Sequence, residues 1–311
     1  MPHLKPQIPK ELSEIVVNFD DKVKLKNYFE DAVKYPSFDK YVEKYSFKNK
    51  KNDTVSEDIL EDSRERLVNA GEMLWASKKY ALLIVLQGMD TADKDGIIKH
   101  VFSGLDPQGC TVASFKVPTP EEHAHDFLWR YNKRLPKRGE IVIFNRSHYE
   151  DVLVTKVHPE FMETLPDQFA LEENKNFWRD RYDDINTFEK HLARNGILII
   201  KFFLHISKDE QKSRLLERLS DEDKYWKVSS NDLQEREHWG DYVAAYEEML
   251  SNTSKEYAPW IIVPANDKKI ARAIVAHSIA GAIDALEIEY PTVDKDGMEY
   301  LRQAKRQLES E

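Results

Sequence analysis

Short apolar runs recur along the chain, separated by stretches in which apolar and charged residues follow a helical period. The clearest runs lie at residues 80–86, 140–144, 196–206 and 260–263, and a weaker run lies at 111–115. Such runs are typical of strands that are buried on both faces of a parallel sheet. Because strands and helices alternate, we predict right-handed crossovers and a three-layer α/β fold around a central parallel sheet.

The first quarter of the chain lacks these runs. Apolar and charged residues are mixed over 22–45, the polar segment KNKKND occupies 48–53, and residues 60–75 have the spacing of an amphipathic helix. We therefore predict a mostly helical N-terminal extension over residues 1–75. A core over residues 76–293 and a C-terminal tail over 294–311 complete the predicted organisation.

Composition narrows the class of protein. The 311 residues carry a formal net charge of −10, whereas nucleic-acid-binding proteins usually present a basic face. The single cysteine, Cys110, excludes an internal disulfide and a thiolate zinc site. The apolar runs are far shorter than the roughly 20 residues that span a membrane, and the N-terminus has no apolar signal segment. We expect a cytoplasmic protein that binds neither nucleic acid nor membrane.

A candidate phosphate loop follows the first predicted strand. Residues 87–96 read QGMDTADKDG and precede an amphipathic helix, so backbone N–H groups at the helix start and the Lys94 ammonium would attract an anion. Against the pattern G-x-x-x-x-G-K-[ST], Gly88 and Lys94 match, while Asp93 replaces the second Gly and Asp95 replaces the metal-binding Ser or Thr. The alternative is an ordinary turn with Lys94 in solvent.

Asp90 favours the phosphate-loop interpretation. A carboxylate inside such a loop would repel a phosphate unless a cation lies between them. Mg²⁺ is the natural mediator, because proteins bind it through one or two carboxylates together with phosphate oxygens. Asp90 can thus take the role of the missing Ser or Thr, although a turn-forming Asp is the simpler alternative.

A second polar cluster follows the predicted strand at 140–144. Asn145 and Arg146 come directly after it, and Glu150 and Asp151 lie on the next helix. In a parallel sheet this cluster lies at the same edge as the loop at Gly88. Glu150 and Asp151 can complete a Mg²⁺ site with Asp90, and Arg146 can bind a phosphoryl oxygen. Helix capping and helix-dipole interactions are the alternative.

Further basic residues could bind a polyanion. One group is interleaved with aromatic residues between the second and third predicted strands, and another follows the strand at 196–206 on a predicted pair of helices. The alternative for both groups is a solvated helix face. The candidate residues are Lys116, Arg130 and Arg134 in the first group, and Arg214 and Arg218, one helical turn apart, in the second.

Several ordered segments together resemble the polyphosphate kinase 2 family, particularly its third class. The resemblance runs from about Leu60 to Val293. The segments are LQGMDTADKDGIIKHVFSGLDPQG at 86–109, SFKVPTPEEHAHDFLWR at 114–130, RGEIVIFNRSHYEDVLVTKVHPE at 138–160, RLLERLSDEDKYWK at 214–227 and EREHWGDYVAAYE at 235–247.

The resemblance implies a P-loop kinase-like fold with a helical lid at about 207–247. It implies Mg²⁺-dependent transfer of a phosphoryl group between inorganic polyphosphate and the nucleotides AMP, ADP and ATP, in a homo-oligomer. By position, Asp90 and Lys94 match the Walker A Asp and Lys of the family, and Arg146 matches its Walker B Arg. The remaining matches are Glu150 and Asp151 in the acidic positions, Asn145 as the third-class Asn, and Arg214 and Arg218 as lid arginines.

One residue departs from the family loop, which reads G-x-D-x-x-G-K. Asp93 replaces its second Gly and adds a Cβ and a negative charge beside the phosphates. Two alternatives to transfer from polyphosphate stay open. One is an ATP-dependent nucleotide kinase, against which the missing Ser or Thr at Asp95 argues. The other is a catalytically impaired protein that only binds phosphate.

Overall fold

The computed structural model describes residues 3–37, 52–162, 165, 171, 174–227 and 231–311. Its centre is a five-stranded sheet of order β2-β3-β1-β4-β5 in which every pairing is parallel. The strands are β1 (Ala81–Gly88), β2 (Cys110–Ser114), β3 (Ile141–Asn145), β4 (Ile197–His205) and β5 (Trp260–Pro264). All five coincide with the apolar runs of the sequence, so the predicted parallel α/β fold is confirmed.

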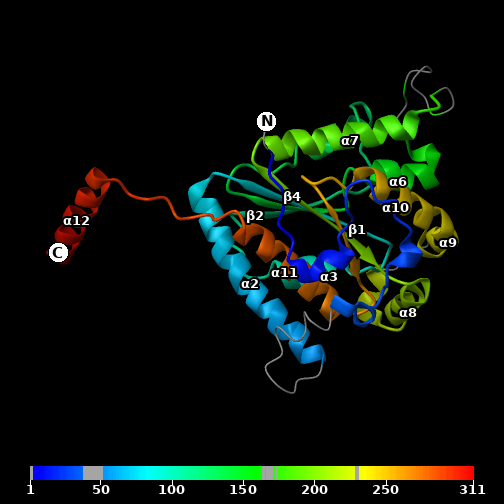
Figure 1. The fold of residues 1–311 in the computed structure, drawn as a ribbon, viewed down its shortest axis with the longest axis horizontal. Helices are drawn as coiled ribbons and strands as arrows, with labels where there is room; N and C mark the ends of the chain where they lie inside the picture. Colours follow the sequence, from blue (N-terminus) through cyan, green and yellow to red (C-terminus); the bar gives the residue numbers. More distant parts are fainter. Residues whose placement is uncertain (1–2, 38–51, 163–164, 166–170, 172–173, 228–230) are drawn as a thin grey trace.

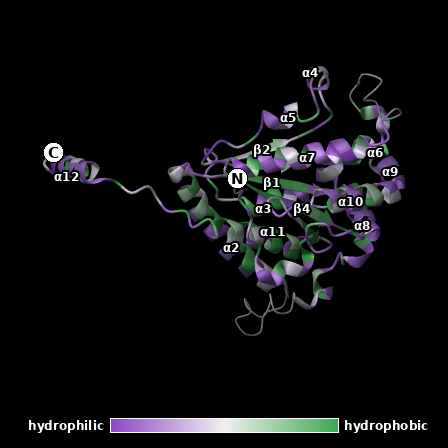
Figure 2. Ribbon diagram, turned by 45° about the horizontal axis from the view of Figure 1, so that its top comes forward, coloured by the Kyte–Doolittle hydropathy of each residue, from purple (hydrophilic) through white to green (hydrophobic). Residues whose placement is uncertain are grey.

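Helices cover both faces of the sheet (Figure 1). On one face, α11 (Lys268–Asp284) packs against α2 (Asn52–Ser77) and α3 (Lys94–Val101). On the other face, α10 (Trp239–Thr253) packs against α6 (Glu150–Val157) and α7 (Phe177–Arg194). Figure 2 shows apolar residues concentrated in the strands between these two layers, with the outer faces of the helices hydrophilic. The predicted three layers therefore arise from burial of the strands on both sides.

The register of the sheet brings the two predicted polar clusters together. Leu86 of β1 lies opposite Asn145 of β3, so both strands end at the same edge. The backbone N–H of Arg146 donates to the carbonyl of Leu86 at 3.2 Å. The loop that leads from β1 to α3 and the loop from β3 to α6 are thus neighbours, as the sequence predicts.

The helical prediction is wrong for most of residues 3–35. This segment contains only the short 3-10 helices η1 (Lys10–Ile15), η2 (Leu25–Asn27) and η3 (Ala32–Lys34). It runs along the edge strand β5, where the backbone N–H of Val17 donates to Trp260 and its apolar residues are buried in the core. Burial against the sheet edge overrides the local helical pattern here. The part of the predicted extension at 38–51 lies outside the described residues.

Between β4 and β5 the chain forms α8 (Lys208–Leu219), η6 (Glu222–Lys227) and α9 (Asn231–Glu237), followed by α10. This is the predicted lid region, and it is helical. Two short helices, α4 (Pro120–His123) and α5 (Trp129–Asn132), and the turn η4 (Pro159–Phe161) flank β3 and α6.

The C-terminal helix α12 (Lys295–Glu309) buries none of its residues and projects from the body of the molecule (Figure 1). Its apolar side chains Met298, Leu301 and Leu308 are exposed. Within the described residues, none of the helices combines the length and the apolar character that a membrane crossing requires.

Candidate active site

The loop from β1 to α3 is a strained turn. Thr91 has φ 68° and Asp93 has φ 77°, both in the left-handed region that non-glycine residues rarely adopt. Gly88 is needed where β1 ends, because a Cβ there would lie 2.9 Å from the carbonyl oxygen of Leu204 in β4. Backbone strain of this kind collects at functional sites, because the surrounding structure must hold it.

Lys94 is the first residue of α3 and its side chain folds back over the loop. Its Nζ donates to the carbonyl oxygens of Gly88 at 2.7 Å and Met89 at 3.3 Å. Burial is the main cause that lowers the pKa of Lys94, and the positive charge of Arg146 lowers it further. The carboxylates of Asp90 and Glu150 act in the opposite direction, which shows that they lie in the same neighbourhood.

Arg146 connects the two loops at the sheet edge. It has φ 63°, and its guanidinium Nη2 lies 3.4 Å from Asp90 Oδ1, while Nη1 lies 3.8 Å from Glu150 Oε2. The charge of Glu150, with a further contribution from Asp90, raises the pKa of Arg146. Asp90, Lys94, Arg146 and Glu150 are therefore brought together, which is what the sequence predicts for a phosphate site.

Two further predicted residues face other partners. Asp151 Oδ2 accepts a hydrogen bond from the Tyr131 hydroxyl at 2.8 Å, on the side of α6 toward α5. Asn145 donates through Nδ2 to Asp95 Oδ1 at 2.9 Å and so ties the end of β3 to α3. The contact with Tyr131 orients the Asp151 carboxylate, while Asp90 and Glu150 are the two carboxylates that lie against the Arg146 guanidinium.

The donor set suits a cation that is shared with substrate. The described residues contain no group of three or more His, Cys, Asp or Glu side chains placed to hold a metal ion by themselves. Mg²⁺ does not require one, because it is commonly bound by one or two carboxylates with phosphate oxygens and water completing the octahedron. Asp90 and Glu150, which lie on either side of Arg146, fit that requirement.

Helix α8 of the predicted lid region contacts the loop from β1 to α3. Gln211 donates to the carbonyl of Asp90 at 3.2 Å, and Arg214 donates to that of Thr91 at 2.9 Å. Arg214 also bonds the carbonyls of Ala265 and Asn266 after β5, and its side chain is only 4% exposed. The Arg214 side chain therefore holds the loop by bonding to the loop's backbone, whereas the Arg218 side chain on the same helix is partly exposed.

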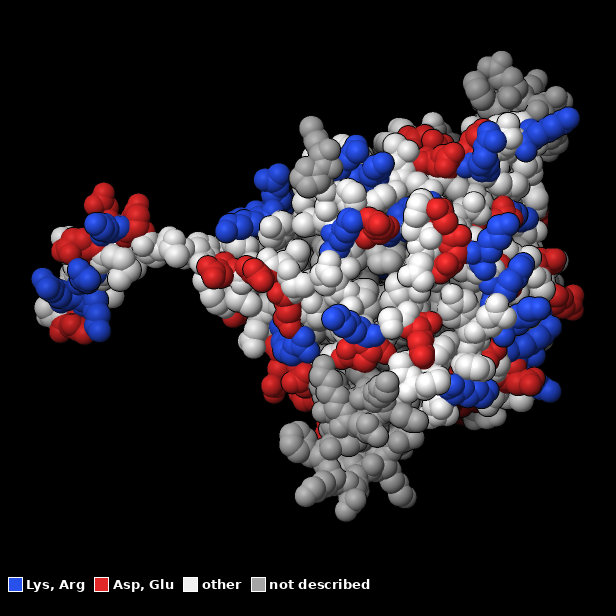
Figure 3. Space-filling model, viewed as in Figure 1, with Lys and Arg blue, Asp and Glu red and all other residues white. Residues whose placement is uncertain are grey.

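The basic residues between β2 and β3 that are predicted to bind a polyanion also fall into two groups, one bonded to the protein and one exposed. Arg130 donates to the carbonyl of Lys116 at 2.8 Å and stacks over the rings of Phe115 and Tyr131. The Lys116 and Arg134 side chains are exposed. Lys and Arg side chains also gather on the side of the molecule formed by α8 and α9, with Asp and Glu among them (Figure 3).

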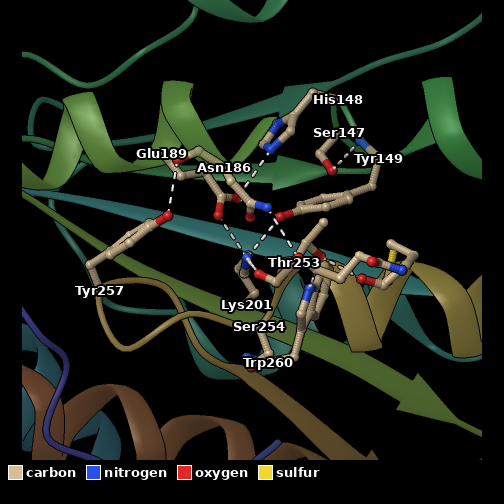
Figure 4. A network of polar contacts seen from close by, with 12 residues as sticks. Ser147, His148, Tyr149, Asn186, Glu189, Lys201, Thr253, Ser254, Tyr257 and Trp260 are labelled. Atoms are coloured by element: carbon tan, nitrogen blue, oxygen red, sulfur yellow. Dashed lines mark hydrogen bonds and ion pairs between the residues drawn. The ribbon is translucent and has the colours of Figure 1, made fainter. Parts of the chain in front are cut away.

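A buried polar network supports the loop that carries Arg146. Figure 4 shows Lys201 of β4 directed at Glu189 of α7 and at the Tyr149 hydroxyl, with both Nζ distances 2.7 Å. Ser147, two residues earlier in the chain, accepts from Gln87 Nε2 of β1 at 3.1 Å. The start of α6 is therefore fixed by hydrogen bonds to β1, β4 and α7.

Sequence reasoning missed several of these residues. Gln211 and Lys201 contact the site or its support only through the tertiary fold, and Arg272 of α11, which pairs with Asp93, is 179 residues away from it in sequence. The lysine in the middle of the apolar run GILIIKFFLHI was a local signal, because a charged residue is buried in a strand only when it is paired.

Comparisons with known proteins identify the family of the chain. A family model described as polyphosphate kinase 2 matches residues 49–291. The chain belongs to the polyphosphate kinase 2 family. It is therefore an enzyme, as its sequence predicts, and enzymes of the polyphosphate kinase 2 family are generally metal-dependent.

The similar proteins include two curated relatives. The ADP-polyphosphate phosphotransferase of Rhodopseudomonas palustris is 47% identical over 251 residues, which cover 81% of this chain and 87% of that protein. The AMP/ADP-polyphosphate phosphotransferase of Meiothermus ruber is 46% identical over 226 residues, which cover 73% of this chain and 80% of that protein.

A crystal structure of polyphosphate kinase 2 from Arthrobacter aurescens TC1 has a similar fold, with a TM-score of 0.82 and 34% identity. The match covers 98% of this chain and 100% of that one. The P-loop kinase-like fold of the polyphosphate kinase 2 family is thus the fold of this chain, as the resemblance implies.

Proposed function

We propose that this chain transfers a phosphoryl group from inorganic polyphosphate to AMP, ADP or both, with Mg²⁺ as the metal ion and ATP as the final nucleotide product. The names of its relatives support the substrates. The observation that carries the proposal is the meeting of Lys94, Asp90, Arg146 and Glu150 at the ends of β1 and β3.

The reaction needs alignment and charge neutralisation more than proton transfer. The acceptor oxygen belongs to a nucleotide phosphate and is already ionised, so the carboxylates are best used as metal ligands. Asp90 and Glu150 would hold the ion, which would neutralise charge on phosphate oxygens of donor and acceptor. Lys94 and Arg146 would donate to the transferred group, and the Arg146 contacts of 3.4 and 3.8 Å leave its guanidinium free to turn.

The remaining predicted residues take two roles. Lys116, Arg134 and Arg218 are at least partly accessible and would bind the polyphosphate chain. Arg130, Arg214, Asn145 and Asp151 are engaged by protein groups, and we assign them to positioning the loops that carry the reacting residues.

The test is incubation with long-chain polyphosphate, Mg²⁺ and either AMP or ADP, with nucleotide products separated by chromatography. We expect ADP or ATP to form only when polyphosphate and Mg²⁺ are both present. A parallel reaction with ATP and AMP but no polyphosphate measures the activity of an ordinary nucleotide kinase. Phosphorylation in that reaction alone would contradict the proposal, and binding of polyphosphate without any product would favour an impaired binding protein.

We also propose a homo-oligomer. The exposed Met298, Leu301 and Leu308 of α12 lie three and seven residues apart on one helix and favour contact with another chain. Light scattering of the full chain tests this, and a mass equal to one subunit would contradict it. The cytoplasmic location and the lack of a nucleic-acid partner stay predictions from composition.

A further inference from the structure

Asp93 stands where the general phosphate-loop pattern has glycine, and its backbone adopts the turn that glycine would provide. Its φ of 77° lies in the left-handed region. Aspartate is among the few non-glycine residues that visit this region readily, because its short side chain can make local hydrogen bonds. The backbone therefore accommodates Asp93, but its carboxylate brings a negative charge that needs a partner.

The carboxylate of Asp93 does not cap the helix that it precedes. Aspartate is one of the best N-cap residues, since its side chain normally accepts a hydrogen bond from an N–H group two or three residues on. Asp93 occupies the N-cap position of α3 but makes no side-chain capping bond. Oδ2 instead accepts from Arg272 Nε at 3.0 Å and Nη2 at 2.7 Å.

Room for this arrangement is provided by Gly96. A Cβ on Gly96 would lie 2.2 Å from Asp93 Oδ1, so the carboxylate occupies the space of the missing side chain. Glycine inside a helix costs roughly 0.5–1 kcal/mol relative to alanine. Asp93 and Arg272 are each only 17% exposed in their side chains, so the pair is largely shielded from water.

The consequence concerns the phosphate ligand. Free N–H groups at a helix N-terminus attract phosphate, and a carboxylate that capped them would compete for the same groups. Arg272 neutralises the Asp93 charge and holds it against α11, on the sheet face that also carries α2. The N–H groups in the first turn of α3 are then not bonded to the Asp93 side chain and stay available to an anion.

We propose that Arg272 is a positioning residue for the phosphate loop: it restrains the Asp93 carboxylate and so keeps the start of α3 available to polyphosphate. This proposal rests on the proposed function, in that it assumes an anionic phosphate ligand at the loop. It makes a specific claim about coupling, namely that the need for Arg272 exists only because residue 93 is acidic.

The test is a double-mutant cycle with Arg272→Ala, Asp93→Gly and the two combined. We expect Arg272→Ala to weaken binding of inorganic tripolyphosphate and to raise KM for polyphosphate by about 10-fold, within the range of coupling between contacting residues. In the Asp93→Gly background the same substitution should change both quantities less than about 2-fold. Lys269→Ala, which removes an exposed positive charge from the first turn of α11 and breaks only a solvent-exposed ion pair with Glu57, is the matched control.

Binding is measured by calorimetry, kcat and KM by ATP formation, and thermal midpoints are recorded for every variant. If Arg272→Ala does not fold, Arg272→Lys, which keeps the charge but not the paired bonds, takes its place in the cycle. Equal impairment of the single and double variants, or a normal Arg272→Ala protein, would overturn the proposal. Failure of the wild type to bind tripolyphosphate would overturn it as well.

The two proposals can fail separately. Wild-type protein that binds tripolyphosphate without forming nucleotide products would contradict the proposed function, while the binding cycle would still decide the role of Arg272. If the wild type turns over normally and the loss caused by Arg272→Ala is not relieved in the Asp93→Gly background, only the inference about Arg272 is contradicted.

Discussion

The buried charged pair that joins β4 to α7 and the charged residues at the carboxyl edge of the sheet are held in opposite ways. Lys201 and Glu189 are fully buried, 2.7 Å apart, and Lys201 also bonds the Tyr149 hydroxyl and the carbonyl of Thr253. Asp90 and Arg146 are 39% and 45% exposed in their side chains and 3.4 Å apart. The buried residues are paired inside the core and fix structure, whereas the edge residues keep polar atoms exposed to solvent.

The largest effect should come from breaking the buried pair. Lys201→Met leaves the Glu189 carboxylate in the core with the Tyr149 hydroxyl and the His148 ring but without its lysine partner, and we expect the free energy of unfolding to fall by about 3–5 kcal/mol. Urea denaturation measures this change. Lys190→Met, at the exposed neighbour of Glu189 on α7, should alter it by less than about 0.5 kcal/mol.

A second substitution tests the cause of that loss. Replacing Glu189 with leucine in the Lys201→Met background removes the unpaired charge, so part of the lost stability should return. A double variant no more stable than Lys201→Met would show that lost packing, and not the stranded carboxylate, explains the effect.

The edge group should respond in the reverse sense. Lys94→Ala or Asp90→Asn should lower polyphosphate-dependent turnover by about 10²-fold or more, the scale of one lost electrostatic contact in a transition state, with little change in unfolding. Steady-state kinetics and thermal denaturation of the same preparations check both parts. Lys99→Ala, exposed on the same helix, is the control, and unchanged turnover in Lys94→Ala would refute its assigned role.

Arg214 lies between the two extremes, because it is buried but bonds the phosphate loop. Arg214→Ala should lower stability by about 2 kcal/mol and turnover by about 10-fold, since it loses charge-assisted bonds to the carbonyls of Thr91, Ala265 and Asn266. Lys212→Ala, exposed on α8, should affect neither. A loss of turnover with no loss of stability would instead place Arg214 on the substrate.

The smallest effect is a pH dependence of the buried network. Burial lowers the pKa of Lys201 to about 8 from 10.5, so between these values the unfolded chain holds a proton that the folded chain has released. Stability then rises with pH, and the difference in unfolding free energy between wild type and Lys201→Met should grow by up to about 2 kcal/mol from about pH 7 to 9.5. A difference independent of pH would show that the Lys201 pKa is not lowered by burial.

The fold and the central part of the site were readable from sequence because their signals are local. Five apolar runs gave the strands, and the rule that parallel strands end at one edge brought Asp90 and Lys94 next to Arg146 and Glu150. The conformation of residues 3–35 along β5 could not be predicted, because it depends on burial against Trp260 and Ile261, which are remote in sequence.

Sequence alone therefore determined the parallel sheet and the types of residue at its edge, namely a lysine-bearing loop and carboxylates that follow neighbouring strands. Tertiary structure decided how each charge is used. It directed Asp151 to Tyr131 and Arg214 to backbone carbonyls, and it paired Asp93 with Arg272. The physical reason is that residue type and spacing specify which groups reach an edge of the sheet, whereas the partner of a charge depends on elements that only folding brings within hydrogen-bonding distance.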